Sequence, residues 1–326
     1  MSVLNDTLAD GGSRVPAVEV SFAIACYNAM PYLEEAIQSA LSQKDTSVEV
    51  IVVDDGSRDD SCDFVRNLAK HDSRVRLLET PHNMGPGGAR NMAIEAMKGE
   101  WLAVLDADDV LLPDRSRLLI DAAIAADADM VADNLIVFGE GLVDQRFLSP
   151  PLATGGDWMT LERYVGDAVM FGRAPNPGFL KPMFRRRTLN DPPLRYNAQL
   201  RIAEDDELIM QLLRVGKRYL VVPTAGYRYR KHSESISHRL SVANCDQMVT
   251  SEMALRDKLM LAGPLPRGYQ RRWDALLNAQ SFVTSIDQIK NRNFAGAVAT
   301  LLRRPSAVGL YRMPVTAQLK RLSPRS

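Results

Sequence analysis

Short apolar runs alternate with amphipathic stretches along the first 140 or so residues of the chain. The apolar runs lack polar alternation, which is typical of strands buried on both faces of a parallel sheet. Between them, apolar residues recur at the three- and four-residue spacing of helices that pack on a sheet. The pattern predicts a doubly wound α/β fold over residues 18–138. Its expected strands span residues 18–25, 48–53, 75–78, 101–105 and 130–138.

Beyond residue 139 the alternation of strands and helices is less regular, and the sequence predicts mostly helices. The elements expected there are helices at 158–171 and 203–213, a strand at 219–222, a polar basic loop at 227–238, and helical stretches at 241–262 and 270–302. We therefore predict an amino-terminal tail, an α/β domain in two halves and a carboxy-terminal helical region. These parts span residues 1–17, 18–238 (halves 18–138 and 139–238) and 239–326.

Length and cysteine content indicate a chain that folds without cross-links. A chain of 326 residues buries a sizeable core without needing disulfides or a structural metal. The three cysteines, Cys26, Cys62 and Cys245, are widely spaced and form no Cys-x-x-Cys pattern, which argues against a zinc site and for a reducing compartment. No apolar run approaches the roughly 18 residues that span a membrane, and no signal-peptide pattern opens the chain. We expect a cytoplasmic protein.

Formal charge is zero overall but is unevenly distributed. Residues 239–326 contain 14 Lys/Arg and 5 Asp/Glu, a balance of +9, so the rest of the chain carries −9. One hypothesis is that basic and apolar residues of this region attach the chain peripherally to the anionic inner membrane; the alternative is an ordinary basic helical cap. The residues concerned are Arg271, Arg272, Arg292, Arg303, Arg304, Lys320 and Arg321, with Leu301, Leu302, Leu310 and Tyr311.

Three carboxylates follow the apolar run 101–105 directly. Open α/β sheets bind ligands at the carboxyl ends of their strands, where Asp106, Asp108 and Asp109 are expected to lie. In extended backbone, Asp106 and Asp108 would point to the same side and converge on one hard cation. The alternative is a helix cap before the next helix, and we assign that role to Asp109.

Two further stretches precede this one. Asp54 and Asp55 also follow a strand, and a carboxylate there would accept the N–H of a nucleobase or form an Asx turn with Gly56 and Ser57. The segment 85–90, Gly-Pro-Gly-Gly-Ala-Arg, precedes an expected helix, so its N–H groups would face an anion. It matches neither a Walker loop nor the dinucleotide fingerprint. A flexible connector is the alternative.

Two candidates lie in the second half. Glu204, Asp205 and Asp206 open a helix and offer a general base, or merely acids favoured at a helix amino-terminus. His232 and His238 lie in the expected basic loop, where they would join a metal site, contact phosphate or remain solvated.

In order and spacing these stretches resemble the family 2 glycosyltransferases, which have the GT-A fold and act on nucleotide-diphospho-sugars. Coverage is about residues 18–238, and the bacterial exopolysaccharide-type enzymes are the most similar in character. The resemblance rests on Cys26-Tyr27-Asn28, Val52-Val53-Asp54-Asp55-Gly56-Ser57, residues 83–91, Leu105-Asp106-Ala107-Asp108-Asp109, residues 181–185, Glu204-Asp205 and the loop 229–237.

The resemblance implies a role for each matching position. Asp108, in the family's DxD motif, and His232 would hold Mg²⁺ or Mn²⁺, with His238 as a substitute for the histidine. Asp205 would deprotonate the acceptor, although the adjacent Asp206 leaves the choice of base open. The nucleotide-sugar would contact Ala25 (where the family often has proline), Tyr27, Asn28, Asp54, Asp55, Gly88, Arg90 and Asp106.

The resulting expectation is an inverting, metal-dependent transferase. It would move a sugar from a nucleotide-diphospho-sugar, with UDP as the expected nucleotide, to a glycan or lipid-linked acceptor in exopolysaccharide or cell-surface polysaccharide biosynthesis; no nucleic-acid partner is expected. One alternative is a non-catalytic nucleotide-sugar-binding protein on the same fold. A second is a phosphoacceptor receiver domain, which the chain's length and the absence of acids after the first strand disfavour.

Overall fold

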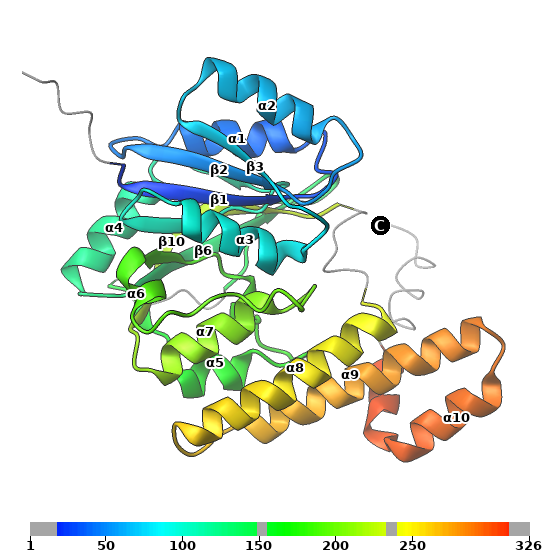
Figure 1. Cartoon of the computed structure of the whole chain (residues 1–326). Helices are drawn as coiled ribbons and strands as arrows, with labels where there is room; N and C mark the ends of the chain where they lie inside the picture. The colour runs from blue at the N-terminus through cyan, green and yellow to red at the C-terminus, as the bar shows by residue number, and fades with distance from the viewer. Residues whose placement is uncertain (1–17, 149–154, 233–239, 313–326) are drawn as a thin grey trace, which may run out of the picture.

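A mixed ten-stranded sheet organises the computed structural model, which describes residues 18–148, 155–232 and 240–312 (Figure 1). The strand order is β3-β2-β1-β4-β9-β6-β10-β5, with β7 paired to β6 and β8 paired to β10. The strands are β1 (Val20–Cys26), β2 (Val48–Asp54), β3 (Val75–Glu79), β4 (Trp101–Val104), β5 (Val110–Leu111), β6 (Met130–Phe138), β7 (Gln145–Arg146), β8 (Asp157–Trp158), β9 (Met183–Arg185) and β10 (Tyr219–Arg230).

The first four strands are parallel, as the apolar runs predict. Every residue of β2 is buried, and so is almost every residue of β1, because helices cover both faces of the sheet. The chain moves outward from β1 to β3 and then returns to place β4 on the other side of β1. The carboxyl ends of β1 and β4 therefore form the point of reversal, which is where doubly wound folds bind their ligands.

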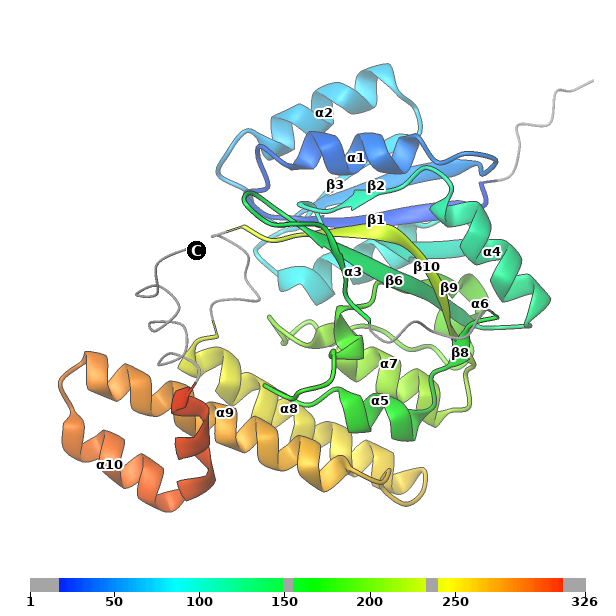
Figure 2. The ribbon, with the colours of Figure 1, turned by 180° about the vertical axis from the view of Figure 1, so that it is seen from behind.

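Helices form a layer on each side of the sheet. Helices α1 and α2 lie above it in Figure 1 and α3 and α7 lie below it; Figure 2 shows the same layers from behind. The predicted helix 158–171 is shorter in the structure, because Trp158 pairs in β8. The helices of this part are α1 (Leu33–Leu41), α2 (Ser61–His71), α3 (Gly85–Ala96), α4 (Arg115–Ala125), α5 (Leu161–Asp167), α6 (Arg186–Asn190) and α7 (Glu204–Arg214), with a 3₁₀ turn η1 (Pro177–Phe179).

Strands from both predicted halves contribute to the same sheet. β9 is antiparallel to its neighbours β4 and β6, whereas β10 runs parallel to β6. The prediction of a loop from residue 227 was wrong in its first four residues, because β10 continues to Arg230 after a register shift between Val222 and Tyr227. This longer strand extends β10 beside the segment that follows β4. The predicted domain boundary at 238/239 falls outside the described residues.

The carboxy-terminal region is helical, and its helices extend along the lower side of the molecule (Figure 1). The single stretch predicted at 270–302 is two helices, because Arg292 adopts φ +60° and the Asn293 side chain caps the second helix by accepting the Gly296 N–H. No described helix is both long and apolar enough to cross a membrane. The elements are α8 (Val242–Leu261), α9 (Tyr269–Lys290), α10 (Phe294–Arg303) and the 3₁₀ segment η3 (Pro305–Tyr311).

Candidate functional site

The predicted site residues gather at one edge of the sheet. Cys26, the last residue of β1, lies in register with Asp54 at the end of β2. Asp106 follows β4 by two residues, on the other side of β1. Polar groups that are about 30 to 50 residues apart in the chain therefore share the carboxyl edge of parallel strands.

Asp55 is the anion that the glycine-rich segment faces. Its buried carboxylate accepts the Met84 N–H at 2.6 Å, the Gly85 N–H at 2.7 Å and the Thr80 hydroxyl at 2.9 Å. Gly85 adopts φ +79°, a conformation that glycine adopts readily, and α3 starts at this residue. The segment is thus neither a flexible connector nor a free phosphate loop, because its first turns are helical and Asp55 occupies its N–H groups.

Asp54 forms the Asx-type turn that was the alternative to base binding. Its Oδ2 accepts the N–H groups of Gly56 at 3.2 Å and Ser57 at 3.0 Å. Its Oδ1 is buried and has no hydrogen-bond partner among the described residues. The Asp54 side chain therefore combines a turn-forming oxygen with one that still has accepting capacity.

The loop after β1 packs against this turn. The Asn28 N–H donates to the Ser57 hydroxyl at 2.9 Å, and the Asn28 side chain accepts the Arg58 N–H at 2.7 Å. Ala25 lies within β1, and the Tyr27 ring is exposed beside it. These three predicted donor-site residues therefore lie at the carboxyl end of β1, beside the Asp54 turn.

Gly88, which is predicted to contact the nucleotide-sugar, lies within α3. It is buried inside α3, where an added Cβ would come within 2.6 Å of the Met84 Cβ. Its lack of a side chain is required by packing within the helix. Its expected contact with the nucleotide would have to come through the backbone.

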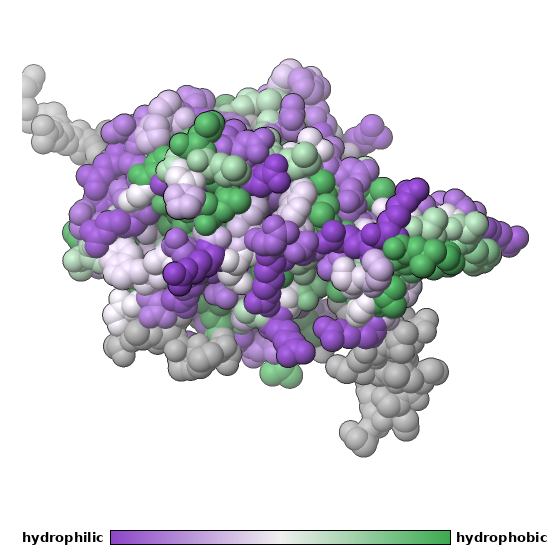
Figure 3. Space-filling view, turned by 90° about the horizontal axis from the view of Figure 1, so that it is seen from below, coloured by the Kyte–Doolittle hydropathy of each residue, from purple (hydrophilic) through white to green (hydrophobic). Residues whose placement is uncertain are grey.

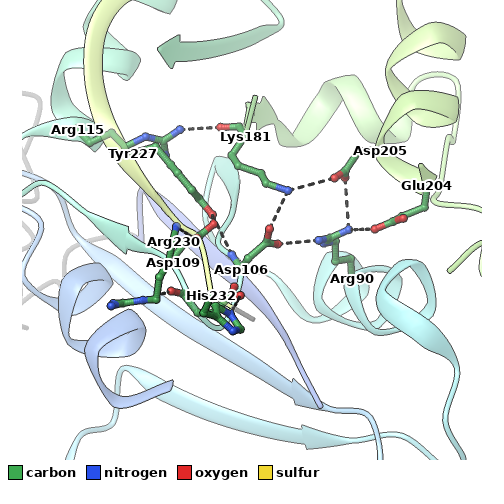
Figure 4. A network of polar contacts seen from close by, with 11 residues as sticks. Arg90, Asp106, Asp109, Arg115, Lys181, Glu204, Asp205, Tyr227, Arg230 and His232 are labelled. Atoms are coloured by element: carbon green, nitrogen blue, oxygen red, sulfur yellow. Dashed lines mark hydrogen bonds and ion pairs between the residues drawn. The ribbon is translucent and has the colours of Figure 1, made fainter. Parts of the chain in front are cut away.

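Arg90 is the centre of the site (Figure 4). This buried side chain of α3 donates to Asp106 Oδ1 at 2.9 Å and to the Glu204 carboxylate, and its Nη1 lies 3.4 Å from Asp205 Oδ1. The guanidinium also lies over the Tyr196 ring, 5.5 Å from its centroid. Arg90 thus connects the segment after β4 to the amino-terminus of α7.

Lys181 is a second buried cation in the site, and sequence reasoning gave it no role. Its Nζ lies 2.8 Å from Asp106 Oδ2 and 3.5 Å from Asp205 Oδ2 (Figure 4). The buried Arg115 side chain, paired with Asp133, donates to the Lys181 carbonyl at 2.6 Å and so fixes its backbone. The available signal was a lone lysine within the apolar run Phe179-Leu-Lys-Pro-Met-Phe, because a lysine is rarely buried without a partner.

The two cations control the ionisation of this cluster. Burial alone would raise the pKa of Asp106, but Lys181 and Arg90 outweigh it and lower that pKa to about 2. Burial likewise opposes the charged form of Lys181, yet Asp106 and Asp205 raise its pKa well above the usual value. Asp106 and Lys181 therefore both carry their charge at neutral pH.

Asp205 and Asp206 point in opposite directions from the start of α7. Asp205 faces Lys181 and Arg90 at the sheet edge. Asp206 accepts the Tyr164 hydroxyl at 2.6 Å and pairs with Arg272 of α9 at 3.2 Å, on the far side of the helix. Of the two carboxylates, only that of Asp205 therefore belongs to the site.

Asp108 and His232 meet although 124 residues separate them. His232 Nε2 lies 2.8 Å from Asp108 Oδ2, and the Asp108 side chain is 33% exposed. Within the described ranges, no group of three or more His, Cys, Asp and Glu side chains is placed to hold a metal by itself. His238, the predicted substitute, lies outside the described residues.

The predictions for the turn after β4 need two corrections. The backbone of 106–109 is not extended, because the Asp109 N–H donates to the Asp106 carbonyl at 3.2 Å, so Asp106 and Asp108 have different partners. Asp109 is not a helix cap, because α4 begins at Arg115 after Asp114. Asp109 is instead buried and accepts the Tyr227 hydroxyl at 2.8 Å and the Arg230 N–H at 2.7 Å.

Asp109 and β10 hold the turn in place. Tyr227, whose hydroxyl donates to Asp109, also accepts the Asp106 N–H at 3.1 Å, and the Arg230 side chain donates to the Asp108 carbonyl at 2.7 Å. Burial, together with the charges of Asp106 and Asp108, raises the pKa of Asp109 well above its usual value. These contacts fix Asp106 and Asp108 relative to His232.

Comparison with known proteins identifies the class. The model of the family described as "Glycosyl transferase family 2" matches residues 21–190. The succinoglycan biosynthesis protein ExoO of Rhizobium meliloti is 39% identical over 312 residues, which cover 96% of this chain and 88% of that protein. The chain belongs to glycosyl transferase family 2 and is a glycosyltransferase.

Two solved structures show the same fold at low sequence identity. Staphylococcus aureus TarS 1–349 in complex with UDP-GlcNAc has a TM-score of 0.60 and 17% identity, covering 88% of this chain and 92% of that one. The Pyrobaculum calidifontis mannosyltransferase PcManGT, in complex with GDP-Man and Mn²⁺, has a TM-score of 0.54 and 17% identity, covering 92% and 80%. The predicted GT-A fold with a helical carboxy-terminal part is confirmed.

Proposed function

We propose that this glycosyltransferase moves a sugar from a UDP-sugar to a glycan or lipid-linked oligosaccharide in exopolysaccharide biosynthesis, with inversion at the anomeric carbon. The observation that carries the proposal is the convergence of Asp106, Asp205, Arg90 and Lys181 at the carboxyl edge of the sheet. The name of ExoO supports the pathway class, and the UDP-GlcNAc in TarS supports a nucleotide-sugar donor. The three free cysteines suit a cytoplasmic location.

The donor binds across the ends of β1, β2 and β4 in this proposal. Asp55 and Asp54 hold the base, since Asp54 Oδ1 has no partner among the described side chains and Asp55 sits beside it. Arg90 and Asp106 lie toward the ribose and diphosphate, with Tyr27, Asn28 and the backbone of Ala25 and Gly88 around the nucleotide. Arg90 and Lys181 offset most of the negative charge that Asp106, Glu204 and Asp205 would otherwise present to an anionic donor.

We place a divalent cation, Mg²⁺ or Mn²⁺, on Asp108 and His232. The hydrogen bond between Asp108 Oδ2 and His232 Nε2, 2.8 Å long, brings a carboxylate and an imidazole together, and both are metal-ligand types. Two protein ligands would leave the remaining ligands to be supplied by donor phosphates and water. When bound, the cation neutralises charge that develops on the leaving diphosphate. The Mn²⁺ in PcManGT supports this choice.

Asp205 is the base in this proposal. It takes the proton of the acceptor hydroxyl while that oxygen bonds to the anomeric carbon, and the bond from this carbon to the diphosphate oxygen breaks. UDP leaves with the bonding electron pair, and attack opposite the leaving group inverts the configuration. Lys181 and Arg90 orient the Asp205 carboxylate between acceptor and donor.

The test compares adjacent carboxylates. Transfer of radiolabelled sugar from UDP-sugars to a membrane extract is expected to fall about 10²–10⁴-fold in Asp205→Asn, because a general base contributes that much. Asp206→Asn is the matched control: it keeps its turnover per folded molecule, because Asp206 faces away from the site. Asp63→Asn, an exposed first-turn acid of α2, controls for the substitution itself.

Two outcomes would contradict the proposal. Full activity in Asp205→Asn would remove its role as base. A wild type that binds UDP-sugar but transfers to no acceptor would favour the non-catalytic alternative.

A further inference from the structure

Helix α10 presents an apolar face to the outside. Phe294, Val298 and Leu302 are spaced four residues apart, so they lie along one side of the helix. Their exposed fractions are 62%, 57% and 74%, whereas Ala297, on the neighbouring side of the helix, is buried. Single exposed apolar residues are common on proteins, but an aligned row of three large ones indicates an interaction surface.

The surface around this face is hydrophobic at its centre and hydrophilic at its edges. Figure 3, which views the molecule from below, shows a hydrophobic patch at the right, at the end of the molecule where α10 lies. Val308 of η3 is 52% exposed and lies in the segment that packs on α9 and α10. The patch therefore extends over two successive elements.

The chain around α10 is exclusively basic in its charges. After Asp287 the sequence contains no further Asp or Glu, and it contains eight Lys/Arg. Those in the described part of the chain are Lys290, Arg292, Arg303, Arg304 and Arg312, of which Arg304 is paired with Asp274; Lys320, Arg321 and Arg325 lie outside the described residues. Two copies of this surface would repel each other, whereas a surface of anionic headgroups would attract it. Charge thus favours a lipid occupant over a second copy of the chain.

The position of α10 also suits a membrane. The carboxyl ends of β1, β2 and β4 point to the right in Figure 1, and α10 lies at the lower right; Figure 2 shows both on the left. The candidate site and α10 therefore lie toward the same end of the molecule.

We propose that the face formed by Phe294, Val298 and Leu302, flanked by Arg292 and Arg303, docks the protein on an anionic membrane surface. The helix lies in the plane of the interface, with its apolar side chains below the headgroups and its arginines among the phosphates. The inference deepens the proposed function and rests on it in one respect, since a lipid-linked acceptor would then be presented at the site.

This surface differs from the one that the sequence suggested. Arg272 is buried, paired with Asp206 and Glu252, so it is unavailable to lipid. The Tyr311 hydroxyl bonds Ser285 and its ring packs against Phe282, so it belongs to the helical core. Arg304 is paired with Asp274. The proposed membrane contact is therefore on α10 and not on these residues.

The test is co-sedimentation of the full chain with vesicles of phosphatidylcholine, with or without phosphatidylglycerol. The wild type is expected to pellet with the anionic vesicles at low salt and to release at high salt. Phe294→Ser with Leu302→Ser should weaken binding at least about tenfold, because two side chains no longer enter the interface. Ile124→Ser, a 59% exposed position on α4, is the matched control and should bind like the wild type.

A charge pair completes the design. Arg292→Gln with Arg303→Gln should reduce the preference for anionic vesicles, whereas Lys70→Gln, an exposed lysine of α2, should not. Wild-type binding by the double serine variant would overturn the proposal, and so would no binding to anionic vesicles at low salt. Self-association that the serine variant abolishes, measured by light scattering without vesicles, would instead assign the face to a second copy.

This outcome is separable from that of the proposed function. Thermal shift by UDP-sugars should be the same in the wild type and in the serine variant, because α10 lies outside the donor site. If UDP-sugars shift the Tm of neither protein, the proposed function is contradicted and the docking surface is not. Pelleting alone decides the docking surface.

Discussion

Two buried arginines flank the amino-terminus of α7, and they differ in what surrounds them. Arg272 contacts Asp206 and Glu252 and also donates to the Ala168 carbonyl at 2.6 Å, within the packing of α5, α7, α8 and α9. Arg90 contacts Asp106, Glu204 and Asp205 at the edge of the sheet. Each cluster has one more carboxylate than it has cations, once Lys181 is counted with Arg90. Charge therefore does not distinguish the two.

Access does distinguish them. In the Arg90 cluster the side chains of Asp106 and Asp205 are 25% and 15% exposed, whereas Asp206 and Glu252 in the Arg272 cluster are 10% and 6% exposed. The helical turn between Asp205 and Asp206 sends one carboxylate to each cluster. An arginine–aspartate pair thus stabilises the packing on one side of α7, whereas on the other side the same kind of pair lies in the candidate site.

Replacing each arginine by methionine should separate these roles most strongly. Both Arg90→Met and Arg272→Met are expected to lower the free energy of unfolding by about 3–5 kcal/mol, because each leaves buried carboxylates unpaired. Only Arg90→Met should also reduce sugar transfer per folded molecule. Urea unfolding and single-turnover transfer, both referred to the folded fraction, measure the two effects. Equal loss of transfer in both variants would contradict the assignment of the site to the Arg90 side.

Metal binding should give a smaller effect, confined to the Arg90 side. With Mn²⁺ at about 100 times its dissociation constant, binding should stabilise the UDP-sugar complex by about 2.7 kcal/mol, which raises Tm by a few degrees. Asp108→Ala should abolish the metal-dependent part of this shift, and chelation should do the same to the wild type. Asp121→Ala, an exposed acid of α4, serves as control. A metal-dependent shift that persists in Asp108→Ala would remove this residue from the metal site.

The smallest effect is expected at Glu49, a buried carboxylate of β2 away from both clusters. Burial would raise its pKa, but hydrogen bonds from Ser21, the Lys98 N–H and Arg76 outweigh burial and lower it. The unfolded chain therefore takes up this proton at a higher pH than the folded protein does. The resulting stability is present above the usual glutamate range and is lost as pH falls through the folded pKa.

Glu49→Gln should consequently lose less stability than the wild type between neutral pH and pH about 3, as measured by urea unfolding. Sugar transfer at neutral pH should be unchanged, since Glu49 lies far from the strand ends that form the site. An identical pH dependence in the two proteins would contradict the shifted pKa.

The sequence was most informative where a signal is local. The strand at 130–138 has the bounds of β6 because its apolar run is continuous, and Asp54, Asp55 and Asp106 lie at strand ends because acids end those runs. The first turns of α3 were missed because glycine and proline at 85–88 disfavour a helix; the carboxylate of Asp55 stabilises that start.

Residues whose roles depend on distant partners were harder to predict. Lys181 and Asp109 belong to stretches that carry the family resemblance, but those stretches do not reveal their partners. The partners lie 75 and 118 residues away, in the turn after β4 and on β10. Asp109 looked like a cap because acids commonly precede helices. The choice between Asp205 and Asp206 required knowing which face of α7 meets the sheet, which only tertiary packing determines.

The residues of the candidate site that contact each other are far apart in the sequence, and this has a consequence for folding. Arg90 meets Glu204 across 114 residues, and Asp108 meets His232 across 124. Since contacts between distant residues are costly in loop-closure entropy, they tend to form late. A growing chain that has emerged only as far as β6 would already contain Asp54, Asp55, Asp106 and Asp108, yet the proposed site would still lack Lys181, Asp205 and His232. If the proposed site is the catalytic one, we expect the enzyme to acquire activity only after β10 has joined the sheet.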